Sequence, residues 1–214
     1  MSALTLLAKL NWREHPACQA GILGFFALLV CGGVALSTEL TASSITNAQQ
    51  EDTQRMLSQV LPSSLYDTSP AKEELTLTLD GQPVHLFRAR RDGKVSAIAL
   101  FAESRGYGGQ IKLLLGIDAS GVLTGVRVVS HTETPGLGDK IDLSKTNWIL
   151  GFNGKSLENP GESHWKVKKD GGDFDSFTGA TITPRAVVKG VHESLILFAK
   201  HKGELLDLSA GTKE

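Results

Sequence analysis

One uncharged, apolar run near the start of the chain constrains its architecture more than any other feature. Residues 17–37 read ACQAGILGFFALLVCGGVALS and contain no charged side chain, with Gln19 as the one strongly polar residue. About 20 helical residues span a hydrocarbon core of about 30 Å. A helix is favoured there because lipid offers exposed backbone amides no hydrogen-bond partner. The run therefore predicts a transmembrane helix over residues 17–38.

The charges that flank the run predict its orientation. Lys9 and Arg13 precede it, and the next basic residue is Arg55. Because basic residues stay on the cytoplasmic side, we expect a single-pass protein of the bacterial inner membrane with residues 1–16 in the cytoplasm and the rest in the periplasm. A cleaved signal peptide is the alternative, since residues 35–37 (Ala-Leu-Ser) resemble a cleavage site. A signal core of only about 7–15 residues favours the uncleaved anchor.

Composition excludes several classes of function. The 214 residues include 22 Lys and Arg against 23 Asp and Glu, which argues against a nucleic-acid binder with its usual basic excess. The two cysteines both lie in the apolar run and provide neither a disulfide framework nor a Cys-only zinc site. The six histidines lack paired metal-ligand spacing, so we expect no metal site.

The remainder of the chain predicts a stalk and one folded domain. Apolar residues at helical spacing, ended by Pro62, indicate a stalk helix over residues 39–62. Alternating apolar segments separated by Asp-Gly and glycine-rich turns then predict short strands, and such turns favour an antiparallel sheet. The expected strands lie at residues 75–79, 84–89, 94–102, 111–117 and 122–130.

Beyond these strands the pattern becomes less regular. Residues 139–152 look irregular to helical, and Trp165–Val167 is expected to form a further short strand. Thr183 is predicted to cap a final helix with Pro184 in its first position. The fold class is therefore α+β, a mostly antiparallel sheet with flanking helices on a single N-terminal transmembrane helix. Its folded domain is expected over residues 63–208, followed by a polar tail at 209–214.

The final helix is predicted to carry an apolar stripe that reaches about His201. Its members recur about every four residues, which places them on one face: Val187, Val191, Leu195 and Phe198.

The most informative motif directly precedes this helix. Thr178 and Thr181 flank Gly179-Ala180, and small residues let another molecule approach the backbone closely. A helix start offers unpaired N–H groups and the positive end of the helix dipole, which suits an anion such as a phosphate. An ordinary threonine-rich helix cap also fits this spacing.

The segment Asp175-x-x-Thr178-Gly179-Ala180-Thr181 resembles the flavinylation motif of the FMN-binding domain family. This family includes the G subunit of the Rnf electron-transport complex and the related C subunit of the sodium-pumping NADH:quinone reductase. The resemblance implies FMN bound covalently to Thr181 through a phosphoester bond. It also implies a separate Mg²⁺-dependent flavin transferase with FAD as donor, which reads Asp175, Thr178 and the Gly179-Ala180 pair.

Two further segments are similar to the same family. His131 and residues 133–138 (Glu-Thr-Pro-Gly-Leu-Gly) look like the loop that the family places beside the flavin ring. Residues 106–109 (Gly-Tyr-Gly-Gly), which directly precede an expected strand, also match the family pattern. The resemblance covers residues 75–201, and the compact length resembles the Rnf G subunit more than the longer sodium-pump subunit.

The resemblance also implies where the flavin lies. Its ring is expected between apolar side chains, with Glu133 accepting from the ribityl chain or capping its loop. For Glu133 a solvated loop carboxylate is the alternative. The flavin contacts expected besides Thr181 are Tyr107, Glu133, Thr134, Leu137, Thr178, Gly179, Ala180 and Thr183, with Trp148 and Ile182 as further ring neighbours.

The implied function is that of an electron-carrier subunit in a membrane-bound Rnf-type complex. Such a complex couples electron transfer between ferredoxin and NAD to ion transport, and its other membrane and iron–sulfur subunits are the expected partners. No residue need act as acid, base or nucleophile, so no independent turnover is expected. The alternatives are a carrier like the C subunit of the sodium pump and a non-redox, membrane-anchored binding or scaffold domain.

Overall fold

A computed structural model describes residues 16–207, without the side chains of residues 17–18 and 35–50. The chain divides into two compact units, residues 1–51 and 52–214. The predicted tail at 209–214 and all but the last residue of the predicted cytoplasmic segment 1–16 lie outside the described residues.

Helix α2 extends from Pro16 to Val60. Within the described part of the chain, no helix combines the length and the apolar character needed to cross a bilayer. The transmembrane helix over 17–38 stays a prediction.

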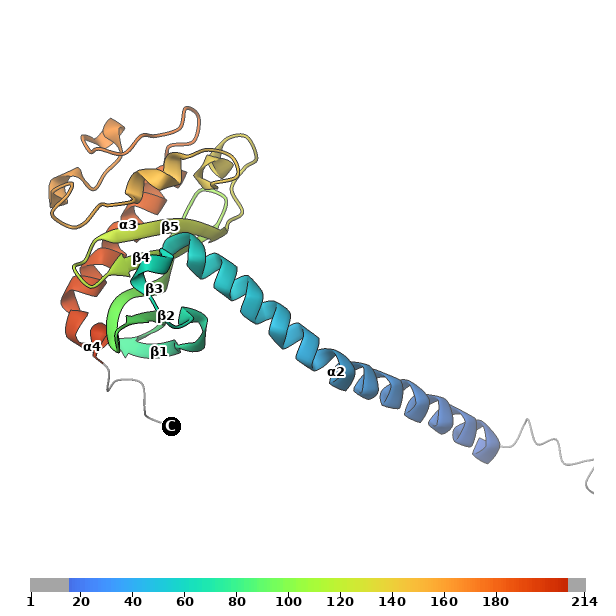
Figure 1. The fold of residues 1–214 in the computed structure, drawn as a ribbon. Coiled ribbons are helices and arrows are strands. Elements are labelled where there is room, and N and C mark those ends of the chain that lie inside the picture. Colours follow the sequence, from blue (N-terminus) through green and yellow to red (C-terminus); the bar gives the residue numbers. More distant parts are fainter. Residues whose placement is uncertain (1–15, 208–214) are drawn as a thin grey trace, which may run out of the picture. The chain divides into compact units, whose positions relative to one another are not determined.

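Five consecutive strands form one antiparallel sheet in the order β1-β2-β3-β4-β5, in which every strand pairs with its neighbours in sequence (Figure 1). This arrangement confirms the predicted α+β class. The strand bounds are β1 Glu74–Leu79, β2 Gln82–Arg91, β3 Lys94–Arg105, β4 Gln110–Asp118 and β5 Leu123–Ser130.

The first two connections are the Asp-Gly turns expected from the sequence. Asp80 and Gly81 have φ values of 50° and 77°, and Asp92 and Gly93 have 51° and 74°. Two successive residues with positive φ form the turn whose twist matches antiparallel strands, and Asp-Gly tolerates that geometry. These local signals therefore fix where β1, β2 and β3 begin and end.

Helix α3, Ile182–Lys200, packs against one face of the sheet, next to the short helix α4, Lys202–Leu206. The predicted apolar stripe is confirmed, because Val187, Val191, Leu195 and Phe198 are all buried. They join the core that the sheet builds from residues such as Leu100. Burying this stripe holds α3 against the sheet.

The opposite face of the sheet carries a second, smaller core. Leu57 and Val60 from the end of α2, together with Leu61, pack there against Phe87 and Leu114. Two 3-10 helices, η2 Ser63–Leu65 and η3 Pro70–Lys72, follow before β1 begins. The sheet is thus covered on both faces.

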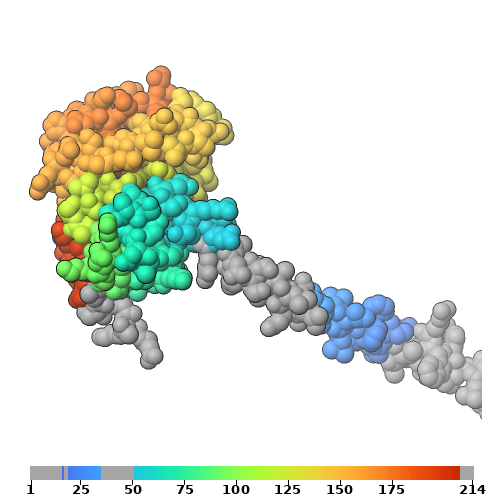
Figure 2. All heavy atoms as spheres, viewed as in Figure 1, coloured from blue at the N-terminus to red at the C-terminus, as the bar shows by residue number. Residues whose placement is uncertain are grey.

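The long segment between β5 and α3 has no regular strand. It contains four 3-10 helices, η4 Gly138–Ile141, η5 Trp148–Phe152, η6 Glu162–His164 and η7 Lys168–Asp170. In Figure 2 this segment, coloured gold to orange, forms one continuous layer of the domain surface.

The strand predicted at Trp165–Val167 is wrong. The backbone there makes only an isolated bridge between Val167 and Phe174. Trp165 and Val167 are buried and Lys166 is exposed, an alternation that imitates a half-buried strand. The alternation arises from packing instead, since the Trp165 ring lies 5.1 Å from that of Phe174 and 6.3 Å from that of Phe152.

The predicted cap of the last helix is also wrong. The helix begins at Ile182 and its N-cap residue is Thr181, with no side-chain capping hydrogen bond. Thr183 lies inside the first turn, is buried, and donates its hydroxyl hydrogen bond to Glu133. The Thr183 hydroxyl, which the sequence predicted to cap the helix, therefore binds the distant carboxylate of Glu133 instead.

Candidate functional site

A cleft of about 330 Å³ lies where three segments distant in sequence meet at the start of α3. They are the loop between β3 and β4, the loop after β5, and the turn that leads into α3. The cleft is lined by Tyr107, Glu133, Thr134, Leu137, Gly138, Gly179, Ala180, Thr181, Ile182 and Thr183. The structure therefore brings together the segments that the sequence singled out separately.

A tight turn over residues 177–180 presents Thr181 to this cleft. The Ala180 N–H donates to the Phe177 carbonyl at 3.2 Å, which closes the turn. Gly179 has φ +85°, a conformation that L side chains rarely adopt, and a Cβ built on it would lie 3.4 Å from Leu137 Cδ2. The positive φ of the turn therefore requires glycine at 179, whereas the contact with Leu137 would tolerate a Cβ.

The start of α3 supplies unpaired donors beside Thr181. The Arg185 N–H donates to the Thr181 carbonyl at 3.4 Å. Among the described residues, the N–H groups of Ile182 and Thr183 have no protein acceptor. These N–H groups and the positive end of the helix dipole favour a negative charge next to the Thr181 hydroxyl.

Glu133, in the loop after β5, is only 5% exposed. Its side chain links this loop to the β3–β4 connection and to the start of α3. Its carboxylate accepts the Gly108 N–H at 2.9 Å and the hydroxyl of Thr183. A Cβ at Gly106 would lie 2.3 Å from Oε1, so the carboxylate fills space that only glycine leaves free.

The alternative of a solvated loop carboxylate for Glu133 is therefore wrong. The sequence singled out Glu133 and Thr183 separately but gave no signal that they pair, because 50 positions separate them.

Three large apolar side chains around the cleft are exposed. The exposed fractions are 75% for Tyr107, 43% for Leu137 and 47% for Ile182. Since soluble domains bury most such side chains, their gathering at one cleft indicates a surface that binds an apolar ligand group.

Trp148, the fourth ring neighbour expected from the sequence, does not line the cleft. Its ring packs against those of Phe152 and Phe177, at 5.4 Å and 5.2 Å, and its Nε1 donates to the Asp175 carbonyl at 2.9 Å. Trp148 thus supports the segment before the turn instead of facing the ligand space.

Two motif residues also lie outside the cleft. Thr178 is exposed, and Asp175 pairs with Lys168 at 2.6 Å while its side chain is 68% exposed. Both side chains face solvent.

An ion pair holds the first turn of α3 to the preceding segment. Arg185 donates from Nε and Nη2 to the two carboxylate oxygens of Asp170, both at 2.6 Å. This bidentate pairing lowers the pKa of Asp170 and raises that of Arg185. Arg185 is therefore engaged with Asp170 rather than free to hold an anion in the cleft.

The donor set of the cleft fits FMN. The hydroxyl of Thr181 and the free N–H groups at the helix start suit its phosphate, and Tyr107, Leu137 and Ile182 suit its ring. The cleft volume of about 330 Å³ lies at the lower end of the range for small-molecule sites, which is about 300–1,000 Å³.

Comparison with known proteins gives matches along most of the chain. The FMN-binding domain family matches residues 106–196, and the RnfG N-terminal region matches residues 18–60. The G subunit of the ion-translocating oxidoreductase complex of Cereibacter sphaeroides is 45% identical over 197 residues, 92% of this chain and 90% of that protein. The G subunit of the same complex in Pseudomonas aeruginosa is 47% identical over 201 residues, 91% of this chain and 94% of that protein.

A solved structure of the C subunit of Na⁺-translocating NADH-quinone reductase from Parabacteroides distasonis is also similar. It is 22% identical, with a TM-score of 0.49 over 72% of this chain and 94% of that chain.

Proposed function

The chain belongs to the family of G subunits of ion-translocating oxidoreductase complexes, and we propose that it carries FMN on Thr181 through a phosphoester bond. It is an electron-carrier subunit of such a complex. The observation that supports the attachment at Thr181 is its place in the cleft, at the positive end of α3. Bound FMN supplies the ability to accept and pass on one or two electrons.

The residues of the cleft hold and orient the flavin. The N–H groups of Ile182 and Thr183 offset the charge that the esterified phosphate keeps. Tyr107 and Leu137 exclude water from the ring, and Glu133 fixes the loops that carry them. No side chain has to move a proton during electron transfer. The protein therefore positions the flavin and sets the polarity of its surroundings.

Attachment requires a second protein in this proposal. A flavin transferase with Mg²⁺ and FAD as donor reads Asp175, Thr178 and the Gly179-Ala180 pair. The exposure of Asp175 and Thr178 supports this part, because the transferase has to reach them from solvent. Asp175 and Thr178 lie outside the cleft, whereas the Gly179-Ala180 pair lines it.

The proposal includes a membrane anchor over residues 17–38, with the FMN-binding domain in the periplasm. It is supported by the uncharged run 17–37 and by the basic residues Lys9 and Arg13 before it. Other membrane and iron–sulfur subunits are the partners, and an anchor would keep the flavin at high effective concentration beside them.

An Rnf-type complex, which moves electrons between ferredoxin and NAD, is the proposed setting. The sodium-pump alternative is less well supported, because the G-subunit relatives are similar over nine-tenths of their length at 45–47% identity.

The attachment is tested by coexpressing the full-length chain with a flavin transferase. We expect in-gel flavin fluorescence after denaturation in SDS and one FMN adduct in the intact mass. Thr181→Ala should abolish both, whereas Thr78→Ala, an exposed control on β1, should keep both. Fluorescence that persists in Thr181→Ala would refute the site. A colourless wild-type protein would favour the scaffold alternative.

A further inference from the structure

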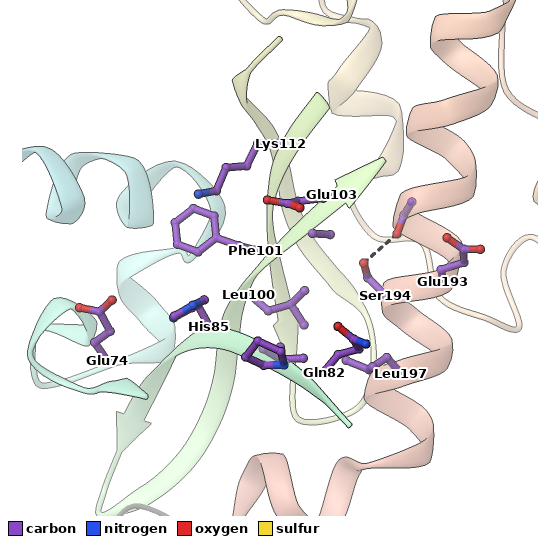
Figure 3. A pocket seen from close by; sticks show the side chains of 14 residues that line it. Glu74, Gln82, His85, Leu100, Phe101, Glu103, Lys112, Glu193, Ser194 and Leu197 are labelled. Atoms are coloured by element: carbon purple, nitrogen blue, oxygen red, sulfur yellow. Dashed lines mark hydrogen bonds between the residues drawn. The ribbon is translucent and has the colours of Figure 1, made fainter. Parts of the chain in front are cut away.

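A second groove, of about 880 Å³, lies between the start of β2, the second half of β3 and helix α3 (Figure 3). It shares no lining residue with the cleft at Thr181. Its apolar side chains include Val84, Leu100 and Leu197. The groove is therefore a separate feature of the domain.

The groove exists because two neighbouring strands separate. The pairing of β2 with β3 ends at Leu86 and Leu100. Beyond that point residues 101–105 of β3 pair only with β4, and residues 82–85 of β2 pair only with β1. Within the described chain, each strand thus keeps one unpaired edge along the groove.

The hydrogen-bond pattern shows which backbone groups face the open edge. The Gly106 N–H bonds the Gly109 carbonyl across the β3–β4 connection. Successive residues of a strand direct their backbone N–H and C=O groups to opposite sides. Since Gly106 bonds toward β4, the even-numbered residues of β3 also bond to β4. The N–H and C=O groups of Phe101, Glu103 and Arg105 therefore point toward the groove.

This edge of β3 is suited to accept another strand. Its five residues, 101–105, span about 16 Å at about 3.3 Å per residue. On the facing edge of β2, Pro83 has no N–H to offer, so β3 provides the more complete set of donors and acceptors.

The rim of the groove has an excess of negative charge. Glu74, Glu103 and Glu193 line it, against a single Lys112. The Lys112 ammonium lies 4.8 Å from the centre of the Phe101 ring. Among the described residues Glu74 has no ion-pair partner, and the nearest cation to Glu193 is Lys189 at 3.7 Å. Basic side chains complement this rim.

We propose that the open edge of β3 binds an extended segment of another subunit, in which apolar residues alternate with Lys or Arg. This inference rests on the proposed function, because it places the chain in a multi-subunit complex. Side chains alternate across a strand, so the apolar ones lie over Leu100 and Leu197, and the basic ones lie near Glu74 and Glu103. Main-chain hydrogen bonds to residues 101–105 provide the affinity.

The experiment uses the purified complex assembled with the full-length chain. A photo-crosslinking residue, p-benzoylphenylalanine, replaces His85, which is exposed and lines the groove. We expect one adduct with another subunit, and mass spectrometry should map it to a segment of alternating apolar and basic residues. The same substitution at Lys145, exposed and outside the groove, should give no adduct with that segment.

Two variants of Glu103 test the mode of binding. Glu103→Pro removes an N–H from the open edge without removing a bond to β4, and should lower the adduct yield about fivefold to tenfold. Glu103→Lys reverses a rim charge, leaves the backbone intact and should also lower the yield. Undiminished yield in a folded Glu103→Lys variant would overturn the proposal.

The outcomes separate this proposal from the flavin assignment. Flavin fluorescence of the same gel band reports the Thr181 attachment independently. A fluorescent protein without an adduct, or with an adduct only to a second copy of itself or to a helical segment, would refute docking at β3. With the flavin transferase coexpressed, a mapped adduct in a colourless protein would support docking and refute the flavin assignment.

Discussion

The hydroxyl of Thr183 in the first turn of α3 donates a hydrogen bond to the carboxylate of Glu133, a residue in the loop after β5. The same carboxylate accepts the N–H of Gly108 from the β3–β4 connection. One buried side chain thus joins the three segments that form the cleft. The position of Thr181 relative to Tyr107 and Leu137 depends on it.

Replacing Glu133 with Ala should destabilise the domain by about 1–3 kcal/mol, because it leaves the Gly108 N–H and the Thr183 hydroxyl without an acceptor. Urea unfolding of the flavin-free chain measures this, with Glu158→Ala on the exposed surface as the matched control. A double-mutant cycle with Thr183→Val should show a coupling energy between the two sites. Strict additivity would contradict the observed hydrogen bond.

Gly179→Ala should lower both stability and flavin loading. The φ of +85° at this position strains any L residue, and we expect a loss of about 1 kcal/mol. Gly151→Ala, at a position with ordinary φ and open space, is the control and should leave both unchanged. Thermal melts measure the stability, and in-gel fluorescence after coexpression measures the loading. Normal loading of Gly179→Ala would show that the turn is not required for attachment.

The domain should fold without flavin. Thr181 makes no side-chain capping bond and belongs to neither hydrophobic core, so Thr181→Ala should change the free energy of unfolding by less than about 0.5 kcal/mol. Comparison of thermal melts of the flavin-free wild-type and variant chains measures this. An unfolded variant would mean that the sheet and α3 do not suffice for folding.

Arg88 on β2 connects helix α4 to the sheet through hydrogen bonds. It is 1% exposed, and its Nε and Nη2 donate to the carbonyls of Leu205 and Glu204 at 2.9 Å and 2.8 Å. Burial lowers the pKa of its guanidinium. Arg88→Ala should cost about 2–3 kcal/mol by leaving both carbonyls unpaired.

Guanidinium chloride unfolding checks this value. The exposed Arg91→Ala serves as the control and should stay within about 0.5 kcal/mol of wild type. Equal effects of the two substitutions would show that the hydrogen bonds from Arg88 to α4 contribute nothing to stability.

The Asp170–Arg185 pair predicts a pH dependence. Hydrogen bonding to Arg185 lowers the pKa of Asp170 in the folded chain. Its contribution is therefore present above the unfolded pKa of about 3.9 and is lost as the pH falls through the lower folded pKa. Asp170→Asn should flatten the decline of the melting temperature between about pH 5 and pH 3. Glu162→Gln, on an exposed neighbouring 3-10 helix, should leave that decline intact.

Local sequence signals determined most of the regular structure. The Asp-Gly pairs at 80–81 and 92–93 set two turns, and apolar segments between turn residues located all five strands, so the antiparallel sheet was predictable. Spacing every four residues located α3 and its buried face. These features depend on neighbours within a few positions, which is the range over which turn geometry and periodicity act.

The segment between β5 and α3 shows where local signals fail. Trp165 and Val167 alternate like strand residues but are buried by aromatic side chains from elsewhere in the segment. Thr183 looks like a helix cap, yet a carboxylate 50 residues away binds its hydroxyl. In both cases a long-range contact overrides the local preference.

The sequence by itself therefore determined the positions of the strands along the chain, their mostly antiparallel pairing, the final helix and the motif that contains Thr181. Only the tertiary structure decided that Tyr107, Glu133 and Thr181 meet in one cleft, that Trp148 lies outside it, and that β3 keeps an open edge. The physical reason is that periodicity and turn chemistry act between near neighbours, whereas a cleft or an unpaired edge results from packing between distant segments.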